Sequence, residues 1–326
     1  MTFALSRYYL EFKEPFSIAH GTRNGTDLVF LKLEHQGFVA WGEASLPPYL
    51  PETQQTVCDF LERFMVRAFD ISEGLEVLLN RLMEFEQGNY AAKACADIAM
   101  HNLFAQMQSI PVWQLLGVPD YPLPLCTYTI GMGDKAAIRR KLIDAAGFKL
   151  LKVKLGGEND REIIRTIREE TDLPLCADAN QGWHTKEAAL EMINFLAGQS
   201  VLFVEQPLPK YLHSEMKWLK EKSPLPLYAD ESVQTPADVK QVSEGFHGVN
   251  VKLMKCGGLA QGLKMIREAR NYGLHVLIGS MSESGCGITA AAQLSSLADY
   301  ADLDGPLLTK NNPFPMPVYK NGILEL

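Results

Sequence analysis

The stretch Leu150-Leu151-Lys152-Val153-Lys154-Leu155 contains two lysines in an apolar run that otherwise has the composition of a buried strand. Successive side chains of a strand point to opposite faces, so Lys152 and Lys154 lie on the same face. Two like charges in a protein interior are costly unless negative charge compensates for them. An edge strand with solvent-facing lysines is an alternative, but the apolar neighbours favour a central strand. The sequence therefore predicts acidic side chains opposite these lysines.

Similar apolar runs recur along the chain and alternate with amphipathic segments. Strand-like runs cover residues 150–155, 173–177, 201–204, 225–229, 249–253 and 275–278, and helical runs cover residues 160–169, 186–196, 236–244 and 259–272. A repeat of roughly 25 residues suits parallel strands joined by helical crossovers. So many units predict an α/β fold with a closed (β/α) barrel. An open doubly wound sheet stays an alternative, because periodicity alone does not show closure.

The N-terminal third follows a different pattern. Residues 4–10, 28–33 and 38–42 alternate as strands do, which predicts an antiparallel meander. Residues 15–25 lie between the first two strands, and we expect them to form a mobile loop that contains glycine. Residues 52–108 have helical periodicity, which is clearest over residues 91–106. The start of the chain is therefore expected to form a separate α+β domain.

Composition limits the classes of partner. The chain has 326 residues, of which 47% are hydrophobic, and a formal net charge of -8 without a long basic tract. These values argue against binding to nucleic acid or to anionic membranes. The sequence has no apolar stretch of membrane-spanning length, and its start lacks the pattern of a secretory signal, so we expect a cytoplasmic protein. The six scattered cysteines are expected to be reduced core thiols.

Three acidic residues, Asp178, Glu205 and Asp230, each stand at the end of a strand-like run. In a parallel barrel the carboxyl ends of the strands carry the catalytic groups. A ligand set of oxygens, without His or Cys, favours Mg²⁺ over zinc, and Mn²⁺ is the nearest substitute. Any one of these acids could instead cap a helix or pair with a lysine. Three of them in register beside strand lysines favour a metal site.

A third strand lysine, Lys252, completes the predicted chemistry. Lys255 follows it closely, but we expect Lys255 to begin a turn, so the inward position is assigned to Lys252. A free lysine has a pKa of roughly 10.4. A divalent cation and a second lysine nearby disfavour the ammonium form and so lower the pKa of the lysine. Its neutral form can then act as a base near neutral pH. The pattern therefore predicts a metal-assisted proton-transfer site.

These residues, with Pro15-Phe16 and Trp41-Gly42-Glu43-Ala44, resemble the enolase superfamily, its muconate-lactonising subgroup and, within that, the dipeptide epimerases. The resemblance implies a modified (β/α)7β TIM-type barrel over residues 113–309. It also implies an N-terminal α+β capping domain over residues 1–112, completed by about residues 310–326. Enolase-superfamily sites combine a Lys or His base with Mg²⁺ that stabilises an ene-diolate. By resemblance, Lys154 and Lys252 are the acid/base pair on opposite faces, Lys152 adds a nearby positive charge, and Asp178, Glu205 and Asp230 are the metal ligands.

The segment Ala301-Asp302-Leu303-Asp304-Gly305-Pro306 is similar to the Asp-x-Asp pair of the dipeptide epimerases. On a strand, Asp302 and Asp304 share a face and suit the α-ammonium of a substrate, although a turn with ordinary acids is an alternative. Residues 279–284 resemble the loop after the seventh strand of the subgroup, which implies substrate contacts from Ser280 and Met281. Arg23 resembles an arginine that binds an acidic second side chain.

The resemblance implies inversion of the α-carbon of the C-terminal residue of a dipeptide, L-Ala-D/L-Glu, by a two-lysine 1,1-proton transfer through an ene-diolate. It further implies a role in peptidoglycan recycling and a homo-oligomer. Muconate cycloisomerase and o-succinylbenzoate synthase are alternatives, but Asp302 and Asp304 would repel their dianionic substrates. A dipeptide with a non-acidic second residue also stays open. A non-catalytic binding protein fits poorly, because it would bury unpaired charges without using them.

Overall fold

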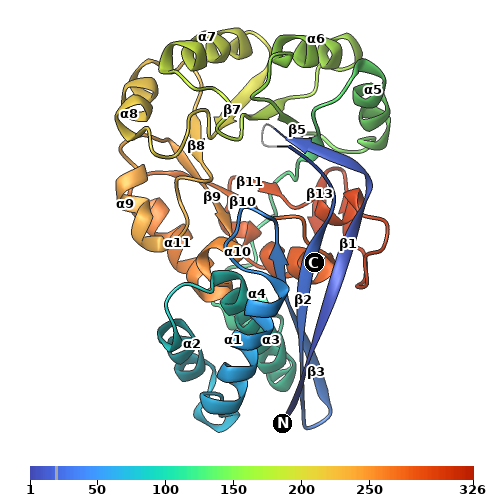
Figure 1. Ribbon diagram of the computed structural model, residues 1–326, viewed down its shortest axis with the longest axis vertical. Coiled ribbons are helices and arrows are strands. Elements are labelled where there is room, and N and C mark those ends of the chain that lie inside the picture. The colour runs from blue at the N-terminus through green and yellow to red at the C-terminus, as the bar shows by residue number, and fades with distance from the viewer. Residues whose placement is uncertain (19–20) are drawn as a thin grey trace.

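An eight-stranded parallel sheet is the centre of the computed structural model, which describes residues 1–18 and 21–326 (Figure 1). Its strands are β4 (Tyr128–Ile130), β5 (Leu151–Lys154), β6 (Leu175–Asp178), β7 (Val201–Glu205), β8 (Leu227–Ala229), β9 (Gly248–Lys252), β10 (His275–Gly279) and β11 (Tyr300–Asp302). Each strand pairs with the next one along the chain. Cys126, just before β4, forms a parallel bridge with Ala301 of β11, and the Thr127 N–H donates to Ala301 O at 2.8 Å. The sheet is therefore a nearly closed barrel, which confirms the predicted fold class.

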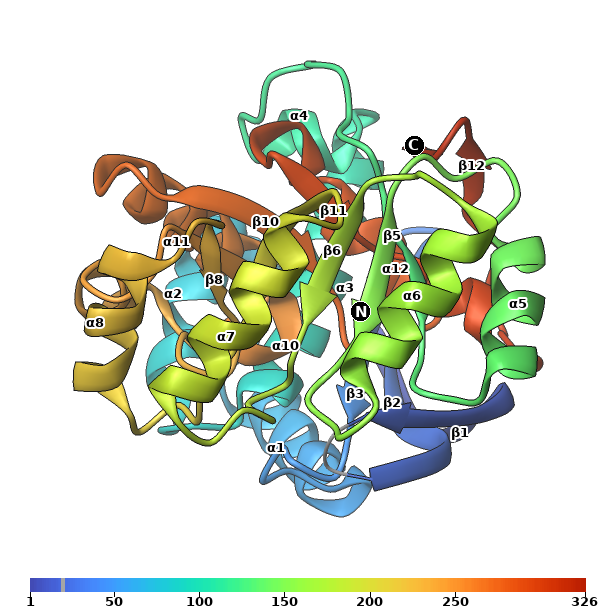
Figure 2. The same cartoon turned by 90° about the horizontal axis from the view of Figure 1, so that it is seen from above.

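Helices lie outside the barrel and connect its strands (Figures 1 and 2). They are α5 (Lys135–Asp144), α6 (Asp160–Glu170), α7 (Lys186–Ala197), α8 (His213–Lys222), η2 (Pro236–Asp238) with α9 (Val239–Val242), α10 (Leu253–Cys256), α11 (Leu259–Asn271), α12 (Gly285–Ala292) and η3 (Ser295–Leu297). Among the described residues, the only helix after β11 is the short η4 (Gly305–Leu308), as a (β/α)7β barrel requires.

One predicted strand ends earlier than expected. Residues 249–253 were expected to form a strand, but Leu253 already begins α10. The tetrapeptide of α10 consists mostly of good helix formers, and Gly257 ends the helix at a φ of 98°, which favours glycine. Lys255 therefore lies within a short helix and not, as predicted, at the start of a turn.

The N-terminal region forms the antiparallel sheet β1 (Thr2–Ile18), β2 (Gly21–His35) and β3 (Phe38–Leu46), followed by α1 (Gln54–Arg67), η1 (Ile71–Glu73), α2 (Leu75–Phe85), α3 (Tyr90–Gln108) and α4 (Val112–Leu115). The loop expected over residues 15–25 is wrong in its conformation for the described part, because these residues continue β1 and β2. Phe16 pairs with Arg23, and a register irregularity between Glu11 and Phe16 leaves Pro15 unpaired, so its missing N–H breaks no ladder bond. Residues 19 and 20 of that prediction lie outside the described residues.

The end of the chain contacts both parts of the molecule. A hairpin of β12 (Val318–Lys320) and β13 (Ile323–Glu325) bridges from Ile323 to Leu125, at the start of the barrel. Phe314 packs against Phe30 and Trp41 of the N-terminal sheet at ring-centroid distances of 5.0 and 5.6 Å. The C-terminal segment therefore connects the N-terminal sheet to the barrel.

The helix α3 joins the N-terminal sheet to the barrel. Gly42 of β3 lies so close to α3 that a Cβ there would overlap the backbone oxygen of Cys95. On another side of α3, the Asp97 carboxylate accepts the N–H of Leu259 at 2.6 Å and so caps the start of α11. The N-terminal region therefore contacts the barrel at the start of α11, in the segment that follows β9.

An apolar layer fills the barrel interior. Its buried residues are Leu150, Cys176, Phe203, Tyr228 and Leu277. The rings of Phe203 and Tyr228 stack with centroids 4.1 Å apart. Because strand side chains alternate, the residues two positions further along β5 to β8 also point inward, above this layer. Those next positions are Lys152, Asp178, Glu205 and Asp230.

Two other expectations concern the whole chain. All six cysteines are free thiols, five of them buried and Cys286 half-buried, as predicted. Among the described residues, no helix is both long and apolar enough to cross a membrane.

Candidate active site

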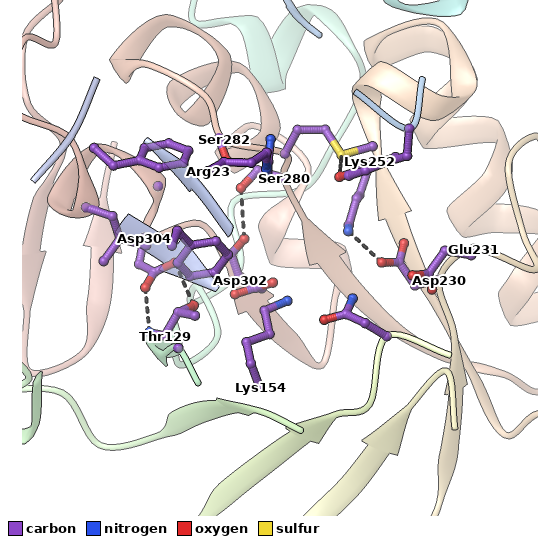
Figure 3. Close-up of a pocket in the computed structure, with 18 of the residues that line it drawn as sticks. Arg23, Thr129, Lys154, Asp230, Glu231, Lys252, Ser280, Ser282, Asp302 and Asp304 are labelled. Carbon is purple, nitrogen blue, oxygen red and sulfur yellow. Dashed lines mark hydrogen bonds and ion pairs between the residues drawn. The ribbon is translucent and has the colours of Figure 1, made fainter. Parts of the chain in front are cut away.

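A cavity of about 430 Å³ lies at the carboxyl ends of the barrel strands (Figure 3). The barrel contributes charged groups to its wall, including Lys154, Lys252 and Asp302. The N-terminal region contributes Arg23 from β2 and Tyr49 from the loop after β3. The cavity therefore lies between the barrel and the N-terminal region, as expected for a site at the mouth of a barrel.

Lys152 and Lys154 both contact acids, as their spacing predicts. Lys152 is 1% exposed, and its Nζ lies 3.0 Å from Asp178 Oδ2, 2.7 Å from Glu205 Oε2 and 2.7 Å from Asp302 Oδ2. Lys154 Nζ lies 2.7 Å from Asp178 Oδ2 and lines the cavity. Lys152 is therefore buried and surrounded by three carboxylates, whereas the Lys154 side chain reaches the cavity.

The three predicted acids stand side by side. Lys154, Asp178 and Glu205 are partners in the strand register, and Asp230 is the first residue after β8. Burial alone would raise the pKa of Asp178, but Lys152 and Lys154 outweigh it and lower the pKa to about 2. Burial, with the negative charge of Asp178, raises the pKa of Glu205 to about 7. The three acids therefore form one cluster with unequal affinities for protons.

Lys252 reaches the cavity from β9 and lies 2.6 Å from Asp230 Oδ2. Burial alone would lower the pKa of Lys252, but the negative charge of Asp230 outweighs burial and raises it. The same pair lowers the pKa of Asp230, although burial alone would raise it. The sequence predicted a lowered pKa for the lysine. The difference arises because that prediction included the positive charge of a divalent cation, whereas the contacts described here are with carboxylates.

Asp302 and Asp304 both line the cavity, but only one of them lies on a strand. β11 ends at Asp302, and Asp304 lies in the turn before η4, so the predicted strand alternation is wrong for Asp304. Thr127 Oγ1 donates to Asp302 Oδ1 at 2.8 Å, and the Thr129 N–H donates to Asp304 Oδ2 at 2.6 Å. These contacts with the segment around β4 hold both carboxylates at the cavity, and Figure 3 shows the one between Thr129 and Asp304.

The two carboxyl groups differ in their charged neighbours. Burial alone would raise the pKa of Asp302, but Lys152 outweighs burial and lowers it. Burial and the charge of Asp302 raise the pKa of Asp304 to about 7. In the described part of the chain, no lysine or arginine forms an ion pair with Asp304. Asp302 is therefore paired with a lysine of the protein, whereas Asp304 has no positively charged partner among the described residues.

Arg23, Ser280 and Met281 also line the cavity. The Arg23 Nη1 is buried without a hydrogen-bond partner among the described residues, and its guanidinium lies 5.8 Å from the ring centroid of Phe12. Burial lowers the pKa of Arg23. Ser280 Oγ donates to the backbone oxygen of Asp302 at 3.2 Å, and the sulfur of Met281 accepts from the Tyr49 hydroxyl at 2.9 Å.

Three further polar residues at the site were not predicted. Lys255 of α10 contacts Asp230, and Asn250 Nδ2 donates to Glu205 Oε1 at 2.6 Å. Burial, with the charge of Asp230, raises the pKa of Glu231 to about 7. Asn250 lies two residues before Lys252 on β9, so strand alternation could have placed it on the inward face. Lys255 and Glu231 follow their strands, and the sequence has no comparable signal for them.

The chemistry of these side chains fits a hard divalent cation. The acids Asp178, Glu205, Asp230, Glu231, Asp302 and Asp304 outnumber the lysines Lys152, Lys154, Lys252 and Lys255. Three buried oxygens here lack a partner within the described residues: Asn180 Oδ1, Asn250 Oδ1 and Glu231 Oε2. As the described side chains stand, no group of three acids is placed to hold a metal ion, and oxygens of Asp178, Glu205 and Asp302 instead surround Lys152 Nζ. A set of carboxylate and amide oxygens without His or Cys nevertheless matches a hard cation.

Comparison with known proteins covers almost the whole chain. Residues 5–117 match the family model described as mandelate racemase/muconate lactonizing enzyme, N-terminal domain, and residues 134–312 match the one described as enolase C-terminal domain-like. The L-Ala-D/L-Glu epimerase of Bacteroides thetaiotaomicron is 40% identical over 320 residues, which cover 98% of this chain and 84% of that protein.

Two solved structures are similar in fold and in sequence. The substrate-liganded complex of the L-Ala-D/L-Glu epimerase from Bacillus subtilis gives a TM-score of 0.92 at 28% identity, covering 100% of this chain and 96% of that one. The dipeptide epimerase from Enterococcus faecalis V583, complexed with Mg and the dipeptide L-Leu-L-Tyr, gives a TM-score of 0.91 at 29% identity. The match covers 99% of this chain and 96% of that chain. The chain therefore belongs to the mandelate racemase/muconate lactonizing enzyme family of the enolase superfamily.

Proposed function

We propose that the protein is a dipeptide epimerase that inverts the α-carbon of the C-terminal residue, with L-Ala-D/L-Glu as its substrate pair. One observation carries the proposal: Lys154 and Lys252 line the same cavity from β5 and β9, which are four positions apart in the strand order of the barrel. Inversion by two bases needs amines that approach one carbon from opposite sides. The names of the similar proteins support the same activity.

Asp178, Glu205 and Asp230 are the residues that we propose to hold Mg²⁺, with Mn²⁺ as a substitute. Oxygen-only ligands favour these ions, and the Enterococcus faecalis relative is described in complex with Mg. When bound, the ion would supply positive charge that offsets the surrounding carboxylates and stabilises negative charge on the substrate carboxylate. Lys152, which contacts two of these acids, would add a further positive charge at the same place.

The acid/base work falls to Lys154 and Lys252. One lysine in its neutral form removes the α-proton, and the other in its ammonium form returns a proton to the opposite face of the planar ene-diolate. The two exchange roles in the reverse direction. Each amine reaches the cavity, and each is oriented by one carboxylate, Asp178 for Lys154 and Asp230 for Lys252. Figure 3 shows the second of these pairs.

The remaining cavity residues would select the substrate. We propose that Asp302 and Asp304 bind the free α-ammonium, and that Ser280 and Met281 contact the substrate. Arg23 would bind an acidic second side chain, since the residue is half-buried, its Nη1 is buried without a hydrogen-bond partner, and it forms no ion pair among the described residues. In this proposal residues 1–112, with about residues 310–326, form the domain that caps the barrel of residues 113–309.

Arg23 leads to a prediction about specificity. We expect Arg23→Leu to lower kcat/KM for L-Ala-L-Glu about 30-fold or more, because losing a buried charge pair costs roughly 2 kcal/mol or more. L-Ala-L-Leu, which makes no ion pair, should be affected by less than about threefold. The check is kcat/KM for both dipeptides, measured by chiral chromatography of the product. An equal loss for both would contradict a charge-specific role for Arg23.

Asp304 leads to a prediction about pH. Its pKa is raised to about 7, so below that pH it is protonated and no longer attracts an ammonium group. We therefore expect KM to rise about tenfold per pH unit below pH 7, and to change little from there to about pH 8, where the α-amino group begins to lose its proton. KM measured across this range checks the prediction, with Asp304→Asn as the control that should lose the dependence. A dependence unchanged in Asp304→Asn would assign the titration to another group.

A second candidate keeps the chemistry and changes the substrate. Arg23 stacks over Phe12, and the relative from Enterococcus faecalis is described with L-Leu-L-Tyr, so a dipeptide with an apolar second residue is the alternative. Incubation with a panel of L-Ala-L-X dipeptides and Mg²⁺, followed by chiral analysis, tests both candidates. Epimerisation of L-Ala-L-Glu ahead of the apolar dipeptides supports the proposal, and the reverse order supports the alternative. Epimerisation of none would refute both.

A further inference from the structure

Lys255 lies one helical turn after Lys252, and its ammonium group is bonded entirely within the protein. The residue is 3% exposed. Its Nζ lies 2.6 Å from Asp230 Oδ1, 2.7 Å from Asp230 O and 3.0 Å from Asn250 O. An ammonium group has three N–H donors, and each of these oxygens can accept one. The donors of Lys255 are therefore fully used without any contribution from a substrate.

Two lysines divide the Asp230 carboxylate between them. Lys255 binds Oδ1, and Lys252 binds Oδ2 at 2.6 Å. Lys252 makes no other hydrogen bond among the described residues, so its remaining N–H donors are available to the cavity. The backbone of Asp230 is also held, because its N–H donates to Gln206 Oε1 at 3.0 Å. Asp230 is therefore fixed from several sides, and Lys252 is the partner with free donors.

A buried carboxylate requires a compensating partner at every stage of a reaction. Lys255 provides a second contact on the other oxygen, and its bonds to two backbone oxygens do not depend on the state of Lys252. The geometry thus gives the two lysines different roles: Lys252 can exchange protons, and Lys255 holds the Asp230 carboxylate in place.

We propose that Lys255 is a positioning residue, which orients Asp230 for the metal and for Lys252 and does not itself exchange protons with the substrate. This inference rests on the proposed function, in which Asp230 is a metal ligand and Lys252 an acid/base. It assigns a role to a lysine that the sequence pattern placed in a turn. It also predicts that replacing Lys255 and replacing Lys252 have different effects: the first weakens Mg²⁺ binding, and the second removes proton exchange for one epimer.

The test compares Lys255→Met with Lys252→Met, which makes the same chemical change at the other oxygen of Asp230. Mg²⁺ binding is measured by titration calorimetry without substrate, and α-proton exchange in D₂O is measured separately for the two epimers. We expect Lys255→Met to weaken Mg²⁺ binding roughly 10- to 100-fold, as changes behind a metal ligand do. It should slow exchange of both epimers by the same factor, with most of the rate recovered at saturating Mg²⁺. Lys252→Met should lose exchange of one epimer only, at any Mg²⁺ concentration.

Two results would overturn the inference. Unchanged Mg²⁺ affinity in Lys255→Met would show that Lys255 does not position Asp230. Loss of exchange for a single epimer in Lys255→Met would make Lys255 an acid/base. If circular dichroism shows that Lys255→Met does not fold, Lys255→Leu, which also lacks N–H donors, is subjected to the same measurements and the same criteria. If the wild-type protein exchanges no dipeptide, the proposed function fails, and the Mg²⁺ titrations still decide the role of Lys255.

Discussion

Lys154→Ala and Lys252→Ala are each expected to abolish epimerisation while the protein stays folded. General acid/base groups contribute roughly 10²- to 10⁴-fold in rate, and inversion needs both of them, so we expect kcat for epimerisation to fall at least about 10³-fold. Each variant retains one lysine, which can still remove and return a proton on its own face. Each should therefore exchange the α-proton of one epimer only, and the two variants should differ in which epimer that is. Exchange in D₂O, followed by proton NMR, measures this.

The matched control for these variants is a surface lysine that forms an ion pair but does not line the cavity. Lys217 lies 3.2 Å from Glu244 on the outside of the barrel, so Lys217→Ala should keep wild-type epimerisation. Thermal unfolding of all three variants shows whether the fold is retained. Near-normal epimerisation by Lys154→Ala or Lys252→Ala would refute the two-base mechanism.

Glu205→Gln is expected to have the second largest effect, through the metal. Glu205 is fully buried, contacts Lys152 and accepts a hydrogen bond from Asn250. Replacing a proposed ligand removes charge that the ion needs, and the stabilisation that a bound ion provides amounts to several kcal/mol. We therefore expect kcat/KM to fall roughly 10³-fold at a fixed low Mg²⁺ concentration. Activity measured against Mg²⁺ concentration, before and after treatment with a chelator, checks this.

Glu283→Gln serves as the matched control for Glu205→Gln. Burial, with the charge of Glu43, raises the pKa of Glu283 to about 8, so a glutamine closely resembles the protonated side chain that is present at neutral pH. Its Oε1 accepts the Met281 N–H at 2.7 Å, and a glutamine keeps this acceptor. The Mg²⁺ dependence of Glu283→Gln should therefore match that of the wild type. A wild-type Mg²⁺ dependence in Glu205→Gln would contradict its role as a ligand.

The barrel and the charged ends of its longer strands could be predicted from the sequence, because strand periodicity and charge are local signals. Lys152 and Lys154 were recognisable because their neighbours are apolar, and Asp178 and Glu205 because each ends an apolar run. β4 and β11 are each three residues long, too short for a periodicity to appear. β11 was therefore predicted to extend to Asp304, which lies in a turn.

The missed features depend on contacts between distant parts of the chain. Lys255 is buried because its partner Asp230 arrives from β8, and no pattern around residue 255 shows this. The extension of β1 and β2 over the described part of residues 15–25 was missed because Pro15 and the glycines suggested a loop, whereas the register irregularity that leaves Pro15 unpaired depends on how the two strands pair. Arg23 thus belongs to a strand, although sequence alone placed it in a loop.

The central claim is that a dipeptide binds with the α-carbon of its second residue between Lys154 and Lys252. The most direct test is proton NMR of L-Ala-L-Glu in D₂O with the wild-type protein and Mg²⁺. The account predicts that deuterium replaces the α-proton of glutamate alone, that L-Ala-D-Glu accumulates, and that removing Mg²⁺ stops both. Exchange at the alanine α-carbon, or no exchange at glutamate, would contradict it.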